Sequence, residues 1–94
     1  MTKSIYSLEM SAFTGWLRDA REGQGLSMRE MAQRLGRSHS FVQKVETGER
    51  RLDVVEYVWY CRALGVLPQD GFDVVADVAD RPGRRSLNAD SRHV

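Results

Sequence analysis

The chain has 94 residues and a formal net charge of +1; 41% of its residues are hydrophobic and 29% are charged. This length supports one small hydrophobic core, so we expect one domain at most. No apolar stretch approaches the ~20 residues of a membrane-spanning helix, and the first residues lack the apolar core of a signal peptide, which favours a cytoplasmic protein without membrane association. The one cysteine, Cys61, cannot form an internal disulfide, and no cluster of Cys and His predicts a metal site.

Charge is distributed unevenly along the chain. Residues 1–52 carry nine Lys and Arg against six Asp and Glu, residues 53–80 carry one against six, and residues 81–94 carry four against one. A basic first half beside an acidic segment fits a protein that turns one side toward a polyanion. Ordinary scatter of surface charge explains the pattern equally well.

The first predicted helix covers about residues 11–22. Phe13, Leu17 and Ala20 fall at i, i+4 and i+7, which is the apolar stripe of an amphipathic helix. Residues 1–10 show no clear pattern, and they either begin this helix or pack as an arm.

A pair of short helices is predicted between Ser27 and Thr47. Ser27 and Glu30 have the spacing of a capping box, which predicts a helix start at the next residue. Gly36 can adopt the left-handed conformation that closes a helix. The apolar face of this first helix is formed by four residues: Met28, Met31, Ala32 and Leu35.

The second helix of the pair is predicted over residues 38–47, with Ser38 as its cap. Its apolar stripe is short, and its other face is polar and free to contact a ligand. Two short helices joined by a turn of about three residues form a helix-turn-helix arrangement. An ordinary αα-hairpin is the alternative, but it would need a wider apolar stripe on the second helix. The apolar residues are Phe41, Val42 and Val45.

Two further helices follow a loop at residues 47–51. Asp53 and Glu56 resemble a second capping box, so a helix is predicted from about 54 to 64, with Cys61 on its apolar face. Trp59 and Tyr60 are either core aromatics or a partner surface.

A fifth, weaker helix starts at Pro68, and Gly71 weakens it further. Its predicted stripe is Phe72, Val75, Ala76 and Ala79.

The runs Leu26–Gly36 and Ser38–Leu52 closely resemble the XRE-like, phage-repressor/Cro-type helix-turn-helix regulators. The resemblance covers about residues 13–66. It implies an all-α fold, a compact four- to five-helix bundle of the lambda-repressor-like type. We expect this helix-turn-helix DNA-binding domain at residues 8–79 and a basic, disordered tail at residues 80–94.

The same resemblance implies a sequence-specific double-stranded DNA-binding transcriptional regulator, and we expect a repressor. Helix 38–47 would read the major groove, where base edges carry a distinguishable pattern of donors and acceptors. The expected base-reading residues are His39, Ser40, Gln43 and Lys44. The expected phosphate-binding residues are Ser27, Arg29, Arg37, Ser38, Arg50 and Arg51.

Two further features depend on this resemblance. Family members often carry a phosphate-binding glutamine where this chain has Met28; methionine cannot make that contact, and Arg29 could replace it. An arginine at the position of Arg21 often pairs with a glutamate at the position of Glu46. We therefore predict a structural salt bridge between them, with two solvated surface charges as the alternative.

Proteins of this type usually dimerise on two half-sites, so we expect a homodimer. The candidate dimer surface is the fifth helix together with Trp59 or Tyr60. One alternative function is an antitoxin that binds operator DNA and, through its tail, a toxin protein. A second is a protein-interaction module that has lost DNA binding. His39 has Ser38 and Ser40 beside it, but adjacent helical positions do not face each other, and no third group is evident near it or His93 to orient such a pair. We therefore expect neither an enzyme nor a cofactor.

Overall fold

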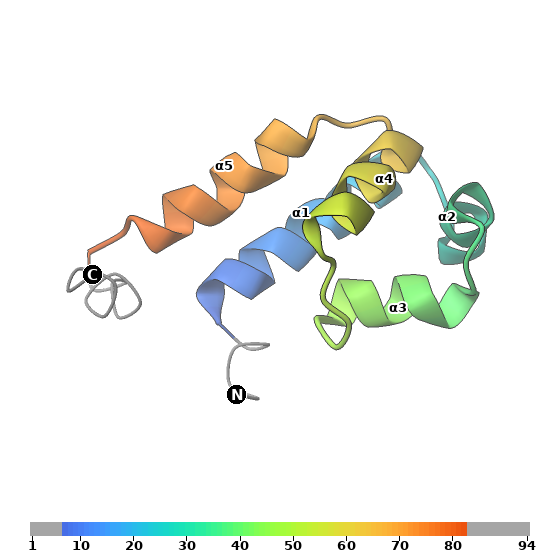
Figure 1. Ribbon diagram of the computed structural model, residues 1–94, viewed down its shortest axis with the longest axis horizontal. Helices are drawn as coiled ribbons and strands as arrows, with labels where there is room; N and C mark the ends of the chain where they lie inside the picture. The colour runs from blue at the N-terminus through green and yellow to red at the C-terminus, as the bar shows by residue number, and fades with distance from the viewer. Residues whose placement is uncertain (1–6, 83–94) are drawn as a thin grey trace.

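The computed structural model describes residues 7–82, and these residues form five α-helices and no strand (Figure 1). The all-α prediction is confirmed. The residues of the predicted tail beyond Pro82 lie outside the described range. None of the described helices is long and apolar enough to span a membrane. The helices are α1 (Leu8–Gly23), α2 (Met28–Leu35), α3 (His39–Thr47), α4 (Val54–Leu64) and α5 (Pro68–Ala79).

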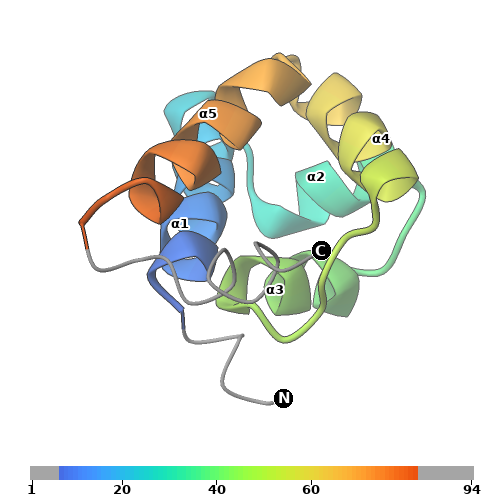
Figure 2. The same cartoon turned by 60° about the vertical axis from the view of Figure 1, so that its left-hand side comes forward.

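The helices surround one core. α5 lies along α1, α2 packs against both α3 and α4, and α3 lies along one edge of the molecule (Figures 1 and 2). Ala32 is buried in this core, where its small side chain allows α2 and α3 to cross closely. The fully buried side chains come from the first four helices and include Leu17, Met31, Val42, Val45, Tyr60 and Leu64.

The helix-turn-helix begins and ends where local chemistry predicts. The Ser27 Oγ accepts a hydrogen bond from the Glu30 backbone N–H at 3.1 Å, and the Glu30 carboxylate accepts one from the Ser27 N–H at 2.8 Å. Gly36 has φ of 68°, in the left-handed region. The Ser38 Oγ accepts from the Phe41 N–H at 3.2 Å and caps α3. These three predictions are confirmed.

The fourth helix also has its predicted limits. Asp53 and Glu56 form the second capping box, with hydrogen bonds of 2.8 and 3.0 Å. The two aromatic residues with an open assignment behave differently: Tyr60 is 1% exposed and belongs to the core, whereas Trp59 is 60% exposed. Cys61 is a buried free thiol.

Two helix predictions differ in detail from the structure. α1 begins at Leu8 rather than near residue 11, so residues 8–10 begin this helix, which was one of the two alternatives left open for them. The start is set by Ser7, which accepts a hydrogen bond from the Met10 N–H at 3.0 Å. In α5 the predicted apolar stripe is shifted by one residue, since Phe72 is 52% exposed while Gly71 is buried. The inward face of α5 consists of Gly71, Val74, Val75 and Val78.

Gly71 explains that shift. A Cβ built on Gly71 would overlap the Tyr57 hydroxyl and come within 2.7 Å of Trp16 Cζ3. The absence of a side chain therefore lets the start of α5 lie directly against both aromatic residues. The Tyr57 hydroxyl donates a hydrogen bond of 2.6 Å to the carbonyl oxygen of Pro68, which fixes it beside this helix.

Candidate nucleic-acid interface

The exposed face of α3 is polar throughout. Val42 and Val45 are 0% and 1% exposed and anchor the inner face of the helix in the core. The opposite face is uncovered by other helices (Figure 1). It carries the four predicted base-reading side chains, which occupy adjacent positions over two turns and are all exposed: His39, Ser40, Gln43 and Lys44.

Arg21 and Glu46 fix the orientation of α3 relative to α1. Arg21 Nε lies 2.6 Å from Glu46 Oε2, and Nη2 lies 3.0 Å from Oε1, so the pair is bidentate. Glu46 is 2% exposed and Arg21 is 7% exposed. The hydrogen bond with Glu46 raises the pKa of Arg21. The two residues therefore form a buried ion pair, not two solvated charges.

Three neighbouring groups also contact this ion pair, one of them the Glu22 carboxylate, which lies 3.6 Å from Arg21 Nη2. Arg21 Nη1 donates to the Leu26 carbonyl oxygen at 2.6 Å, which ties the loop before α2 to the same guanidinium. Arg18 Nη2 donates to the Glu46 carbonyl oxygen at 3.3 Å. One charged pair thus joins α1, the loop before α2, and the C-terminal part of α3.

The start of α2 carries both a negative and a positive side chain, which would have opposite effects on a bound phosphate. Ser27 is already used as a cap, and its own N–H is bonded to the Glu30 carboxylate. That backbone hydrogen bond lowers the pKa of Glu30, so a negative charge occupies this helix end at neutral pH. Arg29 is exposed in the first turn, while Met28 is partly buried against the core. Of these residues, Arg29 is the one with a free cationic group.

The predicted phosphate-binding arginines around α3 fall into two kinds. Arg37 and Arg51 are exposed. Arg50, in contrast, is held by Glu56, with Nη2–Oε2 at 2.6 Å and Nη1–Oε1 at 3.2 Å. This hydrogen-bonded pairing lowers the pKa of Glu56 and raises that of Arg50. Arg50 also donates to the Arg51 carbonyl oxygen, so it braces the loop after α3 against α4.

Phe41 is a member of this surface that the sequence did not assign to it. Its ring centroid lies 4.1 Å from the guanidinium carbon of Arg37 and 5.3 Å from that of Arg50. Arg37 lies in the turn before α3, so helical spacing does not signal its contact with Phe41. The Arg50 contact depends on the path of the loop and has no sequence signal either.

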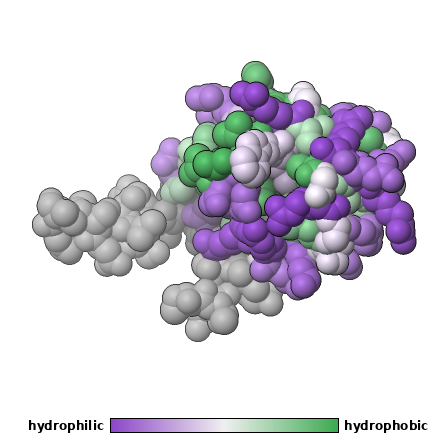
Figure 3. Space-filling view, turned by 45° about the vertical axis from the view of Figure 1, so that its right-hand side comes forward, coloured by the Kyte–Doolittle hydropathy of each residue, from purple (hydrophilic) through white to green (hydrophobic). Residues whose placement is uncertain are grey.

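The molecular surface in Figure 3 is mostly hydrophilic, with apolar residues exposed in small groups.

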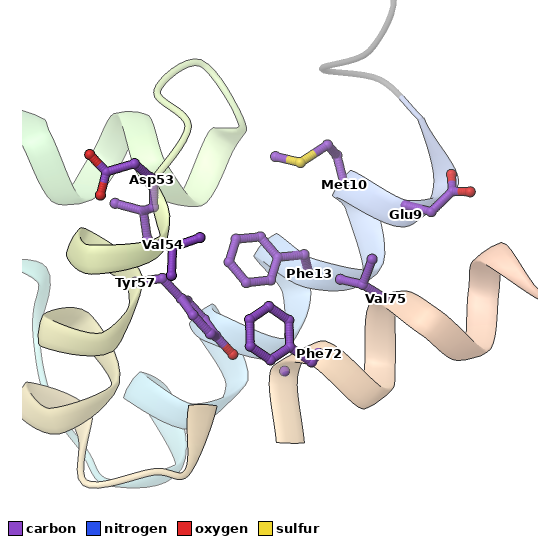
Figure 4. Close-up of a pocket in the computed structure, with 10 residues that line it drawn as sticks. Glu9, Met10, Phe13, Asp53, Val54, Tyr57, Phe72 and Val75 are labelled. Carbon is purple, nitrogen blue, oxygen red and sulfur yellow. The ribbon is translucent and has the colours of Figure 1, made fainter. Parts of the chain in front are cut away.

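A separate apolar hollow of about 210 Å³ lies between α1, α4 and α5 (Figure 4). The Tyr57 ring packs against those of Phe13 and Phe72, with centroid distances of 5.5 and 5.2 Å. Trp59 lies beside a different, smaller hollow near Arg37 and Phe41. The two parts of the predicted dimer surface therefore do not line the same hollow. Within residues 7–82, no group of three or more His, Cys, Asp or Glu is placed to hold a metal ion.

Comparisons with known proteins agree with this geometry. A family model described as a helix-turn-helix domain matches residues 12–73. A solved structure of an XRE-family like protein from Pseudomonas syringae pv. tomato str. DC3000 is 39% identical, with a TM-score of 0.71; the match covers 82% of this chain and 94% of that one. No curated protein matches significantly. The chain belongs to the XRE-like family of helix-turn-helix regulators.

Proposed function

We propose that this protein is a sequence-specific double-stranded DNA-binding transcriptional regulator that reads the major groove with α3. The observation that supports this most strongly is the division of α3 into an inner face, anchored by the buried Val42 and Val45, and an outer polar face that is fully exposed. A helix held in this way fits the major groove, where each base pair presents a distinct pattern of donors and acceptors. We propose that residues 8–79 form the DNA-binding unit.

The base-reading set we propose is His39, Ser40, Gln43 and Lys44. Lysine can donate to guanine O6 and N7, and glutamine suits the N6 and N7 edge of adenine. Their position in the first turns of α3 supports this assignment, because the first turns of a recognition helix meet base edges. Repression would follow directly if the bound domain excludes other proteins from the same stretch of DNA.

Phosphate contacts would set the register of the domain without reading sequence. Arg29, Arg37 and Arg51 are the exposed cations of the predicted set. The hydroxyls of Ser27 and Ser38 accept capping hydrogen bonds. The Ser27 O–H is therefore available as a donor to phosphate, whereas the Ser38 hydroxyl also lies 3.4 Å from that of Ser40, so a phosphate would compete with Ser40 for it. Arg50 is engaged by Glu56, so we assign it a supporting role in the loop.

Lys44 gives the most direct test of base reading. If Lys44 reads guanine, Lys44→Ala should relax sequence preference at one base position and cost about 1–3 kcal/mol on the preferred duplex. The measurement is the affinity for a set of duplexes that differ at single positions. Arg62→Ala, which removes a cation from α4, is the matched control and should leave the preferences unchanged. An equal loss on every duplex would make Lys44 a phosphate contact, and unchanged binding would remove it from the site.

We further propose that the protein acts as a homodimer, with a second copy bound at the hollow between α1, α4 and α5. Phe72 and Val54 stand at this hollow and are 52% and 69% exposed, so it presents apolar surface. Leu52 and Asp53 also line it and directly follow Arg51. A second copy at this position would therefore lie close to the loop that we assign to phosphate contact. Dimers of such domains occupy two half-sites one helical turn apart.

Phe72→Glu should convert the dimer to a monomer, because it places a charge in the apolar contact. Phe72 is 52% exposed, so the monomer should remain folded. Leu67→Glu is the matched control: Leu67 is 66% exposed and does not line the hollow. Sedimentation velocity at micromolar concentration without DNA measures the outcome. A monomeric wild-type protein, or equal effects of the two substitutions, would contradict this interface.

The antitoxin alternative depends on the tail, whose residues beyond Pro82 lie outside the described range. Nothing in residues 7–82 favours it over the regulator. We propose a non-enzymatic protein that works in the cytoplasm, where its DNA would be found.

A further inference from the structure

The ring of Phe41 contacts two guanidinium groups at the edge of the α3 surface. Arg37 lies 4.1 Å from the ring centroid and Arg50 lies 5.3 Å from it. The ring is half-buried and also packs against Tyr60, with centroids 6.5 Å apart. Because Tyr60 is 1% exposed, it supplies a rigid support beneath the Phe41 ring. Phe41 is therefore a fixed platform on the boundary between the core and the exposed face of α3.

The two arginines on this platform have different partners. Arg50 forms the bidentate pair with Glu56, and Glu56 is also bonded to the Asp53 N–H at 3.0 Å. Arg37, in contrast, is exposed and forms no direct salt bridge with a carboxylate among residues 7–82. The Glu56 charge acts on both cations: it is hydrogen-bonded to Arg50, and its electrostatic interaction with Arg37 is weaker. It thereby reduces the repulsion between two guanidinium groups beside a single ring. The platform thus holds one arginine in a hydrogen-bonded ion pair and one whose N–H groups are available to an anion.

Arg37 lies where a cation without a direct carboxylate partner could contact a DNA phosphate. It lies between Gly36, which closes α2, and Ser38, which caps α3. The turn that carries it is therefore continuous with the first turn of α3, where base contacts are proposed. A flexible arginine loses side-chain freedom when it binds a phosphate, whereas a guanidinium already stacked on an aromatic ring has lost part of that freedom beforehand.

We propose that Phe41 is a positioning residue for DNA binding, whose ring orders Arg37 for contact with a backbone phosphate while Glu56 retains Arg50 as a support. This inference rests on the proposed function, because it assumes that α3 faces a duplex. The inference assigns a role in DNA affinity to Phe41, which the hydrophobic periodicity of α3 assigns to the buried apolar stripe. It also predicts that the contributions of Phe41 and Arg37 to binding are coupled.

A double-mutant cycle on DNA affinity tests the coupling. The probe is the tightest duplex selected from a random pool by the wild-type protein, measured at several salt concentrations. Arg37→Met should reduce the salt slope by about one, as expected for one lost phosphate contact. Phe41→Leu should weaken binding about two- to tenfold, the loss that corresponds to ordering one flexible side chain. In the Arg37→Met background, Phe41→Leu should have no further effect. Phe41→Tyr, which retains the ring, should bind like the wild type.

Additive losses from Phe41→Leu and Arg37→Met would overturn the proposal, because a purely structural role of Phe41 does not depend on Arg37. Absence of binding by the wild type to any duplex would instead remove the proposed function itself. Nuclear spin relaxation of the arginine Nε groups in the free wild-type protein gives an independent readout. Arg37 should be more ordered than Arg29, an exposed arginine of α2 with no ring contact among the described residues. Equal mobility of the two would also overturn the proposal.

Discussion

Replacing Arg21 with alanine is expected to lower the free energy of unfolding by about 3–5 kcal/mol, because it leaves the Glu46 carboxylate buried without its bidentate partner. Glu46 is 2% exposed, so the unpaired carboxylate would carry a large desolvation cost. The substitution also leaves the Leu26 carbonyl oxygen without the donor that approaches to 2.6 Å. In a domain of this size such a loss corresponds to a fall in melting temperature of roughly 12–40 °C.

Thermal and denaturant unfolding of matched variants measure this effect. Arg18→Ala is the control, since the Arg18 side chain is 45% exposed and its Nε lies 4.0 Å from Glu46 Oε1; it should cost no more than ~1 kcal/mol. Replacing both Arg21 and Glu46 with methionine should recover much of the loss, because neither charge is then left buried alone. Unchanged melting temperatures for Arg21→Ala and Glu46→Ala would show that the bridge is not structural.

Gly71→Ala is expected to destabilise the protein even though alanine is the better helix former. Intrinsic propensity favours alanine by about 1 kcal/mol at a helical position. The added Cβ, however, would overlap the Tyr57 hydroxyl and lie within 2.7 Å of Trp16 Cζ3. Tyr57 cannot easily move aside, because its ring packs against both Phe13 and Phe72 and its hydroxyl is bonded to Pro68. Overpacking of this kind costs about 1–3 kcal/mol, so the steric effect should determine the sign.

Gly15→Ala is the matched control for this prediction. Gly15 also lies within a helix, but a Cβ added there has no heavy atom within 4 Å. The same substitution should therefore stabilise the protein by up to ~1 kcal/mol through helix propensity alone. Opposite shifts of the urea midpoint for the two variants are the expected result. Stabilisation by both substitutions would show that α5 can move away from α1 at little cost.

The helix limits were predictable where the signal is local. Ser27, Gly36, Ser38 and Asp53 act on backbone groups within a few residues of themselves, so their roles follow from spacing alone. The register of α5 was not predictable in this way, because the hydrophobic pattern counts glycine as a break. What places Gly71 against the core is the approach of two aromatic residues from α1 and α4.

The candidate site shows the same division between local and tertiary causes. The polar face of α3 is visible in the sequence, since it follows from the periodicity of one helix. The Arg21–Glu46 pair was expected only from resemblance to a family. The engagement of Arg50 by Glu56 was missed, because it requires the loop after α3 to return to the first turn of α4. From sequence alone, an arginine on a loop beside the recognition helix is predicted to bind phosphate, because its neighbours in space are not known.

The measurement that tests the central proposal most directly is selection of bound duplexes from a random DNA pool at two salt concentrations. We expect enrichment of an inverted repeat at both concentrations, with total affinity falling as salt rises because phosphate contacts release counterions. Enrichment of one short, unrepeated site would retain the base-reading role of α3 and contradict the dimer. No enrichment, with weak binding that disappears at the higher salt concentration, would contradict sequence-specific reading by α3.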